Sequence, residues 1–276
     1  MWIARTKADL RQKLKSVPRP VILIPTMGAL HAGHASLIDL ARKNAGENGT
    51  VLVSIFVNPI QFDRTSDLKE YPRPLDSDLA VCEQQGADGV FLPTDSEMYL
   101  PDHSINVIEN QLSSHLCGAT RPGHFDGVCT VVLKLFNLTG CDAAVFGAKD
   151  FQQLAIIQRL VRDLDLNIEI ITHPTIREDH GLAMSSRNEL LLPNHHADAP
   201  RIRRALLSAS TKTDAKEILE TARIELESSP HARIDYLSLV NADTLEPTEN
   251  ISAPCILACA VFYGDVRLID HIGIKD

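Results

Sequence analysis

Long apolar runs, basic clusters and cysteine pairs are all missing from this sequence. No apolar run approaches the roughly 20 residues that cross a membrane, and no Lys/Arg-rich run offers a surface for nucleic acid. The formal net charge of −9 over 276 residues also argues against a polyanionic partner. Residues 1–16 mix cationic and apolar side chains, which predicts an amphipathic first helix rather than a signal peptide. We therefore expect a cytoplasmic protein that binds neither nucleic acid nor a membrane.

Several catalytic and metal-binding motifs are missing as well. The six cysteines are scattered and include no C-x-x-C pair; they are Cys82, Cys117, Cys129, Cys141, Cys255 and Cys259. This spacing favours buried free thiols over disulfides or a zinc site. The chain contains no G-x-S-x-G, G-x-x-x-x-G-K-[ST] or H-E-x-x-H motif. The sequence therefore predicts no activated serine nucleophile and no dedicated metal site.

Short apolar runs alternate with helical patterns over the first two thirds of the chain. The predicted strands are residues 21–24, 51–57, 90–92, 143–146 and 168–171, and the predicted helices are residues 35–42, 76–85, 128–138 and 151–164. This alternation predicts a Rossmann-like α/β domain over residues 1–174, with a parallel sheet covered by helices on both faces.

The last hundred or so residues have a different pattern. Residues 195–210 and 214–228 are helical, and strands follow at residues 234–240, 254–262 and 266–269. This order predicts a smaller α+β domain over residues 175–276.

The junction after the first strong strand is the most informative part of the sequence. Residues 21–24 lead into Pro-Thr-Met-Gly-Ala-Leu-His-Ala-Gly-His at 25–34, and a helix follows. Small residues let the backbone approach a ligand, and the start of a helix attracts phosphate. His31 and His34 are spaced to project to the same side of a helical turn. Histidines at this spacing also bind metal or cap helices, but the preceding strand and turn favour a nucleotide site.

Other polar clusters follow predicted strands or, at residues 184–188, an irregular stretch. Residues 58–62 carry two amides, residues 147–153 carry Lys149 after a glycine, and residues 184–188 join two serine hydroxyls to Arg187. Cations and hydroxyls of this kind suit a polyphosphate, and parallel sheets bind ligands beyond the carboxyl ends of their strands. Each cluster also has a structural interpretation, as a turn, a solvated helix start or an ordinary loop. The turn at 121–125 either shapes a carboxylate site or lies on the surface.

Taken together, these motifs resemble the pantothenate synthetase family, the AMP-forming pantoate–β-alanine ligases of the H-x-G-H nucleotidyltransferase group. The matching segments are residues 25–28, 31–34, 54–62, 121–125, 134–137, 147–153, 185–188 and 264–270. The resemblance covers essentially the whole chain in order. One departure is Ala148, where the family usually has Glu or Gln.

The resemblance implies a two-step reaction. Pantoate attacks the α-phosphorus of ATP to release pyrophosphate and form a pantoyl adenylate, and β-alanine then displaces AMP to give pantothenate. It also implies Mg²⁺ arriving with ATP, a homodimer, and a C-terminal domain that acts as a lid.

The resemblance implies roles for individual residues as well. ATP would contact Met27, Gly28, Ala29, Leu30, His31, Ala32, Gly33, His34, Gly147, Ala148, Lys149, Asp150, Ile176, Met184, Ser185, Ser186 and Arg187. The catalytic residues would be His34 as proton donor, with His31, Lys149 and Arg187. Gln61 and Gln153 would hold pantoate, and Gln61 would also contact β-alanine.

Two other functions compete with this one. One is a nucleotidyltransferase that acts on another small carboxylate or phosphate substrate and leaves the nucleotide on its product. It needs H-x-G-H but not the paired glutamines Gln61 and Gln153, so their presence counts against it. A noncatalytic nucleotide-binding module should have lost a histidine, Lys149 or Arg187, and all are present.

Overall fold

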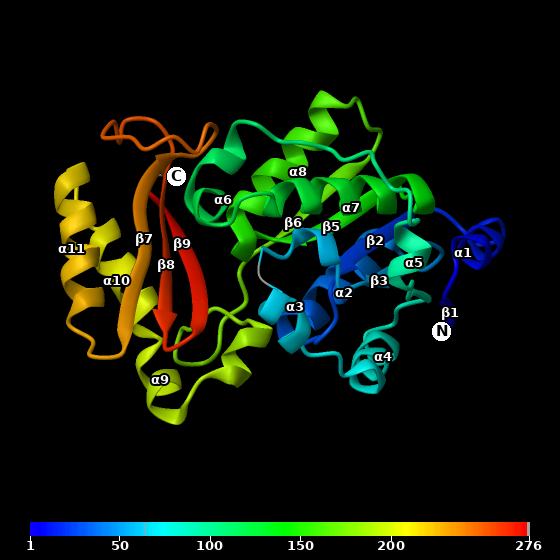
Figure 1. Ribbon diagram of the computed structural model, residues 1–276, viewed down its shortest axis with the longest axis horizontal. Helices are drawn as coiled ribbons and strands as arrows, with labels where there is room; N and C mark the ends of the chain where they lie inside the picture. The colour runs from blue at the N-terminus through cyan, green and yellow to red at the C-terminus, as the bar shows by residue number, and fades with distance from the viewer. Residues whose placement is uncertain (64, 275–276) are drawn as a thin grey trace. The chain divides into compact units, whose positions relative to one another are not determined.

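The computed structural model describes residues 1–63 and 65–274, and its backbone forms two compact units (Figure 1). The first unit comprises Met1–Glu109, Arg121–Ala148 and Ile156–His173. The second comprises Asn110–Thr120, Lys149–Ala155 and the chain from Pro174 onward. The chain thus passes between the units several times.

The first unit is built on a six-stranded sheet. In spatial order its strands are β1 (Trp2–Ala4), β4 (Gly89–Phe91), β3 (Thr50–Ile55), β2 (Val21–Thr26), β5 (Ala143–Gly147) and β6 (Glu169–His173). Every neighbouring pair is parallel. The central strands β2 and β3 are almost wholly buried, as β-branched runs covered on both faces should be.

Helices connect these strands. They are α1 (Lys7–Leu14), α2 (Ala32–Ala45), α3 (Thr65–Glu70), α4 (Leu75–Gln84), α5 (Asp95–Met98), α7 (His124–Thr139) and α8 (Phe151–Asp163), whose first turn belongs to the second unit. One face of the sheet packs Ile22 and Ile24 against Ile38 of α2 and Cys82 of α4. Right-handed crossovers put the helices that follow β2 and β3 on this face and α7 and α8 on the other.

The strand order reverses between β2 and β5. From β2 the chain runs through α2 to β3 on one side, and from β5 it runs through α8 to β6 on the other. The carboxyl ends of β2 and β5 therefore flank a topological switch point, where open α/β sheets bind their ligands.

The second unit pairs an antiparallel sheet with helices. Its strands are β7 (Ala232–Asn241), β8 (Cys255–Tyr263) and β9 (Val266–Ile274), and its helices are α6 (Leu116–Thr120), α9 (Pro193–Asp198), α10 (Arg201–Ser210) and α11 (Ala215–Glu227). Helix α10 contacts α11 and β9, and α11 contacts β7. Ile202, Leu206, Ile218 and Leu257 are fully or almost fully buried in the core between them.

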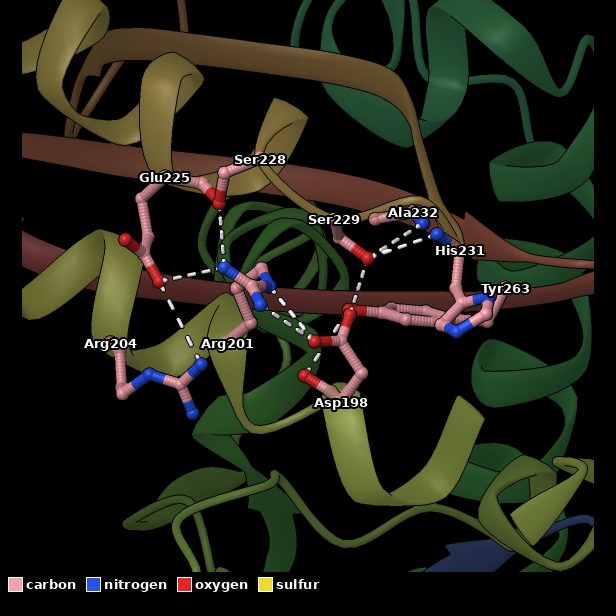
Figure 2. A network of polar contacts seen from close by, with 9 residues as sticks. All are labelled: Asp198, Arg201, Arg204, Glu225, Ser228, Ser229, His231, Ala232 and Tyr263. Carbon is pink, nitrogen blue, oxygen red and sulfur yellow. Dashed lines mark hydrogen bonds and ion pairs between the residues drawn. The ribbon is translucent and has the colours of Figure 1, made fainter. Parts of the chain in front are cut away.

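A polar network at the end of α9 joins four elements of this unit (Figure 2). The Asp198 carboxylate accepts hydrogen bonds from Arg201 at 2.8 Å, from Tyr263 of β8 at 3.1 Å and from Ser229. Arg201 also donates to Glu225 of α11 at 3.1 Å. Burial raises the pKa of Asp198, but the bonds from Arg201, Ser229 and Tyr263 outweigh it and hold the pKa below its usual range.

The structure confirms the mixed α/β fold, with a parallel sheet and a separate small antiparallel sheet. All six cysteines are free and buried, as expected. Among the described residues no helix has the length and apolar character that a membrane span requires.

Three predicted elements were wrong in part. The expected first helix over residues 1–16 is strand β1 followed by α1, because Trp2 pairs with Gly89 of β4. The expected helix over 195–210 is broken into α9 and α10 at Pro200, which has no N–H to continue the first helix. The last strand continues to Ile274 because β9 pairs with β8 along its whole length.

Replacing Asp198 with asparagine should make the second unit less stable in a pH-dependent way. A carboxylate with a lowered pKa stabilises the fold above the unfolded pKa of about 3.9 and loses that effect as pH falls through the folded pKa. We expect Asp198→Asn to cost about 1.5–3 kcal/mol at pH 7, and the difference from the wild type should begin to narrow below about pH 4. Urea unfolding of both proteins at pH 7 and pH 3 measures the difference in their free energies of unfolding. The same difference at both pH values would contradict the role assigned to the Asp198 carboxylate.

Candidate functional site

A buried carboxylate holds the loop that follows β2. Asp78 of α4 is 1% exposed and accepts hydrogen bonds from the Ala29 amide at 3.0 Å and the Leu30 amide at 2.7 Å. Burial raises the pKa of Asp78, and the two amide bonds offset only part of that rise. Gly28 has a φ of +83°, and a Cβ there would lie 2.9 Å from Asp78 Oδ2. The loop therefore needs glycine at 28 both for its backbone angle and for room beside the carboxylate.

His31 and His34 form a capping box at the start of α2. His31 is the N-cap, and its Nδ1 accepts from the Gly33 amide at 3.1 Å. His34 Nδ1 accepts from the His31 amide at 3.3 Å, and the two ring centroids are 4.1 Å apart. A neutral imidazole that accepts at Nδ1 carries its proton on Nε2. Capping therefore makes each ring a donor at Nε2, so capping and phosphate binding do not compete.

A buried amide network follows β3. The 3-10 helix η1 (Pro59–Gln61) begins after Asn58, whose Nδ2 donates to Gln61 Oε1 at 3.0 Å. Gln61 Nε2 lies 2.8 Å from the Met27 sulfur, so this network reaches the loop after β2. The Tyr99 hydroxyl donates to Asn58 Oδ1 at 2.8 Å, and burial raises the pKa of that hydroxyl. The sequence did not single out Tyr99.

The turn at 121–125 supports η1 from the side of α7. His124 Nδ1 lies 2.7 Å from the Gln61 carbonyl oxygen, and Arg121 is paired with Asp63 at 3.1 Å. A Cβ at Gly127 would lie 2.6 Å from Gln61 Cα, so only glycine lets α7 approach η1 this closely. Through His124 the turn contacts the backbone of Gln61, so the turn is not a plain surface loop. The carboxylate site at this turn stays a prediction.

Lys149 and its neighbours lie where β5 ends and α8 begins. The Lys149 ammonium is 3.5 Å from Asp150 Oδ1, and its side chain is 20% exposed. Gln152 is buried, donating to the carbonyls of Leu112 and His115 and accepting from the Cys117 amide. Gln152 therefore has a structural role in the second unit, whereas its neighbour Gln153 is only half-buried.

A hairpin carries the segment that includes Ile176 and Met184. The Met184 amide donates to the Ile176 carbonyl at 2.9 Å. Arg177 between them makes a bidentate pair with the buried Asp270 of β9, at 2.7 and 2.9 Å. Ser185 then caps the 3-10 helix η4 (Ser186–Leu190) by accepting from the Arg187 amide. The hairpin and the cap together set the backbone of residues 184–187.

The candidate residues fall in both units. Met27, Gly28, Ala29, Leu30, His31, Ala32, Gly33, His34, Gln61, Gly147 and Ala148 belong to the first, and Lys149, Asp150, Gln153, Ile176, Met184, Ser185, Ser186 and Arg187 belong to the second. Within the first unit, the residues after β2 and those that end β5 lie at the carboxyl ends of neighbouring strands, and Gln61 contacts Met27 in the first of these segments.

Residues outside the motifs also position this site, and no sequence motif singles them out. Asp78, Tyr99 and Gly127 each make their contacts across long sequence separations. The sequence signal for Asp78 is a charged residue on the apolar side of α4. This signal becomes visible when it is known which side of α4 is buried.

Replacing Asp78 with asparagine should loosen the loop after β2. An amide has one acceptor oxygen, so one of the Ala29 and Leu30 amides would face an N–H donor instead of a carboxylate oxygen. We expect Asp78→Asn to speed hydrogen exchange of these two amides at least about tenfold, the equivalent of about 1.4 kcal/mol. Asp76→Asn, at an exposed position of the same helix, is the matched control. Unchanged exchange in Asp78→Asn would contradict this role.

Known proteins resemble the chain over its full length. The family model described as Pantoate-beta-alanine ligase matches residues 2–273. The pantothenate synthetase of Akkermansia muciniphila is 52% identical over 276 residues, covering 98% of each chain, and that of Acetivibrio thermocellus is 43% identical, covering 100% of each.

Solved structures give the same result. The pantothenate synthetase of Thermus thermophilus superposes with a TM-score of 0.93 at 39% identity and covers 100% of both chains. The Francisella tularensis enzyme, described as complexed with β-γ ATP and β-alanine, has a TM-score of 0.84 at 32% identity and covers 100% of this chain and 98% of its own. By its sequence, its fold and its matched length, the chain belongs to the pantoate–β-alanine ligase family.

Proposed function

We propose that this protein condenses pantoate with β-alanine at the expense of ATP, through a pantoyl adenylate. The observation that carries the proposal is the pair of capping histidines, held at the switch point between β2 and β5 with Nε2 as the donor atom. Family membership supports the substrates, and the complex of the Francisella tularensis relative supports ATP and β-alanine in particular.

The chemistry requires that negative charge be masked. A carboxylate attacks an α-phosphate that is itself anionic, so cations and donors must stabilise the charge that gathers on the phosphate oxygens. His31 and His34 would donate from Nε2 beside the positive end of the α2 dipole. Lys149 and Arg187 would bind phosphate oxygens, with Arg187 able to do so through two parallel bonds. His34, the proton donor that the resemblance implies, would share its Nε2 proton in a hydrogen bond to an oxygen of the departing pyrophosphate, and its ring would stay neutral.

The remaining contacts orient the reactants. Gln61, fixed by Asn58 and next to Met27, would hold the pantoate hydroxyl and carboxyl groups and then contact β-alanine. Gln153 would contribute from the second unit. The other ATP contacts would come from residues 27–34, from Gly147 to Asp150, from Ile176 and from residues 184–187. Positioning of this kind converts a bimolecular attack into a nearly unimolecular one.

Several further features stay predictions of the family resemblance. Magnesium would enter with ATP, held mainly by phosphate oxygens. The domain over residues 175–276 would act as a lid that shields the mixed anhydride from water. A homodimer and a cytoplasmic location are expected on the same ground. A nucleotidyltransferase that leaves the nucleotide on its product is not favoured, because Gln61 and Gln153 are both present.

Isotope exchange between pyrophosphate and ATP tests the first half-reaction. With Mg²⁺ present and β-alanine omitted, labelled pyrophosphate should enter ATP only when pantoate is added, because only then does the adenylate form reversibly. Acetate in place of pantoate is the matched control and should give no exchange. Exchange that ignores pantoate, or none at all, would contradict the proposed function.

Removing the Lys149 cation should nearly abolish the reaction. Loss of one well-placed donor to a charged transition state typically costs about 10²–10³ in rate, and we expect this loss in kcat for Lys149→Ala. Lys43→Ala on the exposed face of α2 should retain full activity. Steady-state AMP formation measures both, and thermal unfolding checks that both variants fold. A folded Lys149→Ala enzyme with kcat within a few-fold of wild type would overturn this role.

A further inference from the structure

Two histidines and one carboxylate gather in the second unit, outside the residues proposed to contact substrates. Glu178, His180 and His196 each offer one ligand atom, and these atoms all lie within 4.8 Å of one another. His180 Nε2 is 3.2 Å from Glu178 Oε2, and His196 Nε2 is 3.0 Å from the same oxygen. The two imidazole centroids are 5.1 Å apart.

The local backbone brings these three side chains together. Glu178 and His180 lie at the tip of the hairpin, where the Glu178 amide donates to Leu182 and the Gly181 amide returns to the Glu178 carbonyl, both at 2.8 Å. Gly181 has a φ of +98°, which closes the turn. His196 comes from α9, so the cluster joins two separate elements of the same unit.

We propose that Glu178, His180 and His196 bind a divalent transition-metal ion, with Zn²⁺ as the best fit. Zinc bonds to nitrogen and carboxylate oxygen at about 2.0–2.2 Å, which places tetrahedral ligand atoms about 3.3–3.5 Å apart. The two nitrogen–oxygen distances need to grow by only a few tenths of an ångström to meet this value. The donor set of two imidazoles and one carboxylate suits Zn²⁺, Co²⁺ or Ni²⁺ and disfavours Mg²⁺ and Ca²⁺, which prefer oxygen.

An outer contact already orients the carboxylate. Asn188 Nδ2 donates to Glu178 Oε1 at 2.6 Å, which leaves Oε2 as the atom that faces both imidazoles. Such contacts to a ligating carboxylate fix its orientation and tune the metal affinity. The side chains of His180 and His196 are 41% and 39% exposed, so solvent can supply the fourth ligand.

The metal would connect to the segment that ends in Arg187. Asn188 also donates to the Ala183 carbonyl at 3.1 Å, so it ties the carboxylate to the segment that leads into residues 184–187. An ion bound between the hairpin and α9 would restrict both elements at once. We therefore assign the site a structural role in the second unit.

Metal titration of the full-length protein without nucleotide tests this site. The expected result is one Zn²⁺ ion bound per chain by calorimetry, a rise in the thermal midpoint on adding Zn²⁺, and intense visible d–d absorption when Co²⁺ is used instead. Mg²⁺ at millimolar concentration should not displace the Co²⁺. None of these three readouts depends on catalysis, so their failure leaves the proposed function untouched, and failure of the proposed function leaves the metal site untouched.

Substitutions separate this cluster from other ligands in the chain. We expect His180→Asn with His196→Asn to weaken Zn²⁺ binding at least 100-fold and to abolish the Co²⁺ bands. His195→Asn is the matched control, because its ring lies against His231 at 5.2 Å and Tyr263 at 6.0 Å instead of Glu178. Both variants change half-exposed side chains, and their metal-free thermal midpoints check that they fold. Equal Zn²⁺ binding by the wild type and the double variant would show that the cluster is an ion pair only.

Discussion

One buried carboxylate shapes the centre of the first unit. Asp78 reaches from α4 to the loop after β2 and binds two consecutive backbone amides there. Those bonds hold Ala29 at a φ of +52°, a conformation that a residue with a side chain seldom adopts. The loop then enters α2 with His31 at the N-cap. The geometry of the whole H-x-G-H segment therefore depends on a side chain distant in sequence.

The same loop is joined to the next strand by amides. The Gln61 side chain accepts a hydrogen bond from Asn58 and contacts Met27. Gly127 leaves the space that lets α7 pack against the backbone of Gln61. A buried polar group costs free energy unless it has a hydrogen-bond partner. A network in which each group has its partner therefore favours one conformation. A reaction in which a carboxylate must be oriented towards phosphorus benefits from a single conformation, because a small displacement of the reacting atoms lowers the rate strongly.

The sequence predicted the parts of this structure that local pattern controls. The apolar runs of β2 and β3 and the turn before α2 are visible in short windows, and so is the spacing of His31 and His34. The sequence could not show which distant residues complete the site. Asp78 acts on residues 48 and 49 positions away, and strand β1 forms where Trp2 pairs with the distant Gly89 of β4.

The metal cluster illustrates the same limit. Glu178 and His180 lie close in sequence, but His196 belongs to another element, and no ligand-spacing motif links the three. Pro200 ends α9 shortly after His196. The helical pattern over residues 195–210 did not show this break. Only the folded second unit brings these side chains within reach of one ion.

In the proposed reaction a carboxylate oxygen of pantoate attacks the α-phosphorus of ATP, and pyrophosphate leaves as the adenylyl group is transferred to pantoate. The most direct test uses pantoate labelled with ¹⁸O in its carboxylate, converted completely with ATP, Mg²⁺ and β-alanine. If an adenylate forms, one ¹⁸O atom should appear in the phosphate of AMP and none in pyrophosphate. Label in inorganic phosphate or pyrophosphate, or AMP without label, would contradict the account.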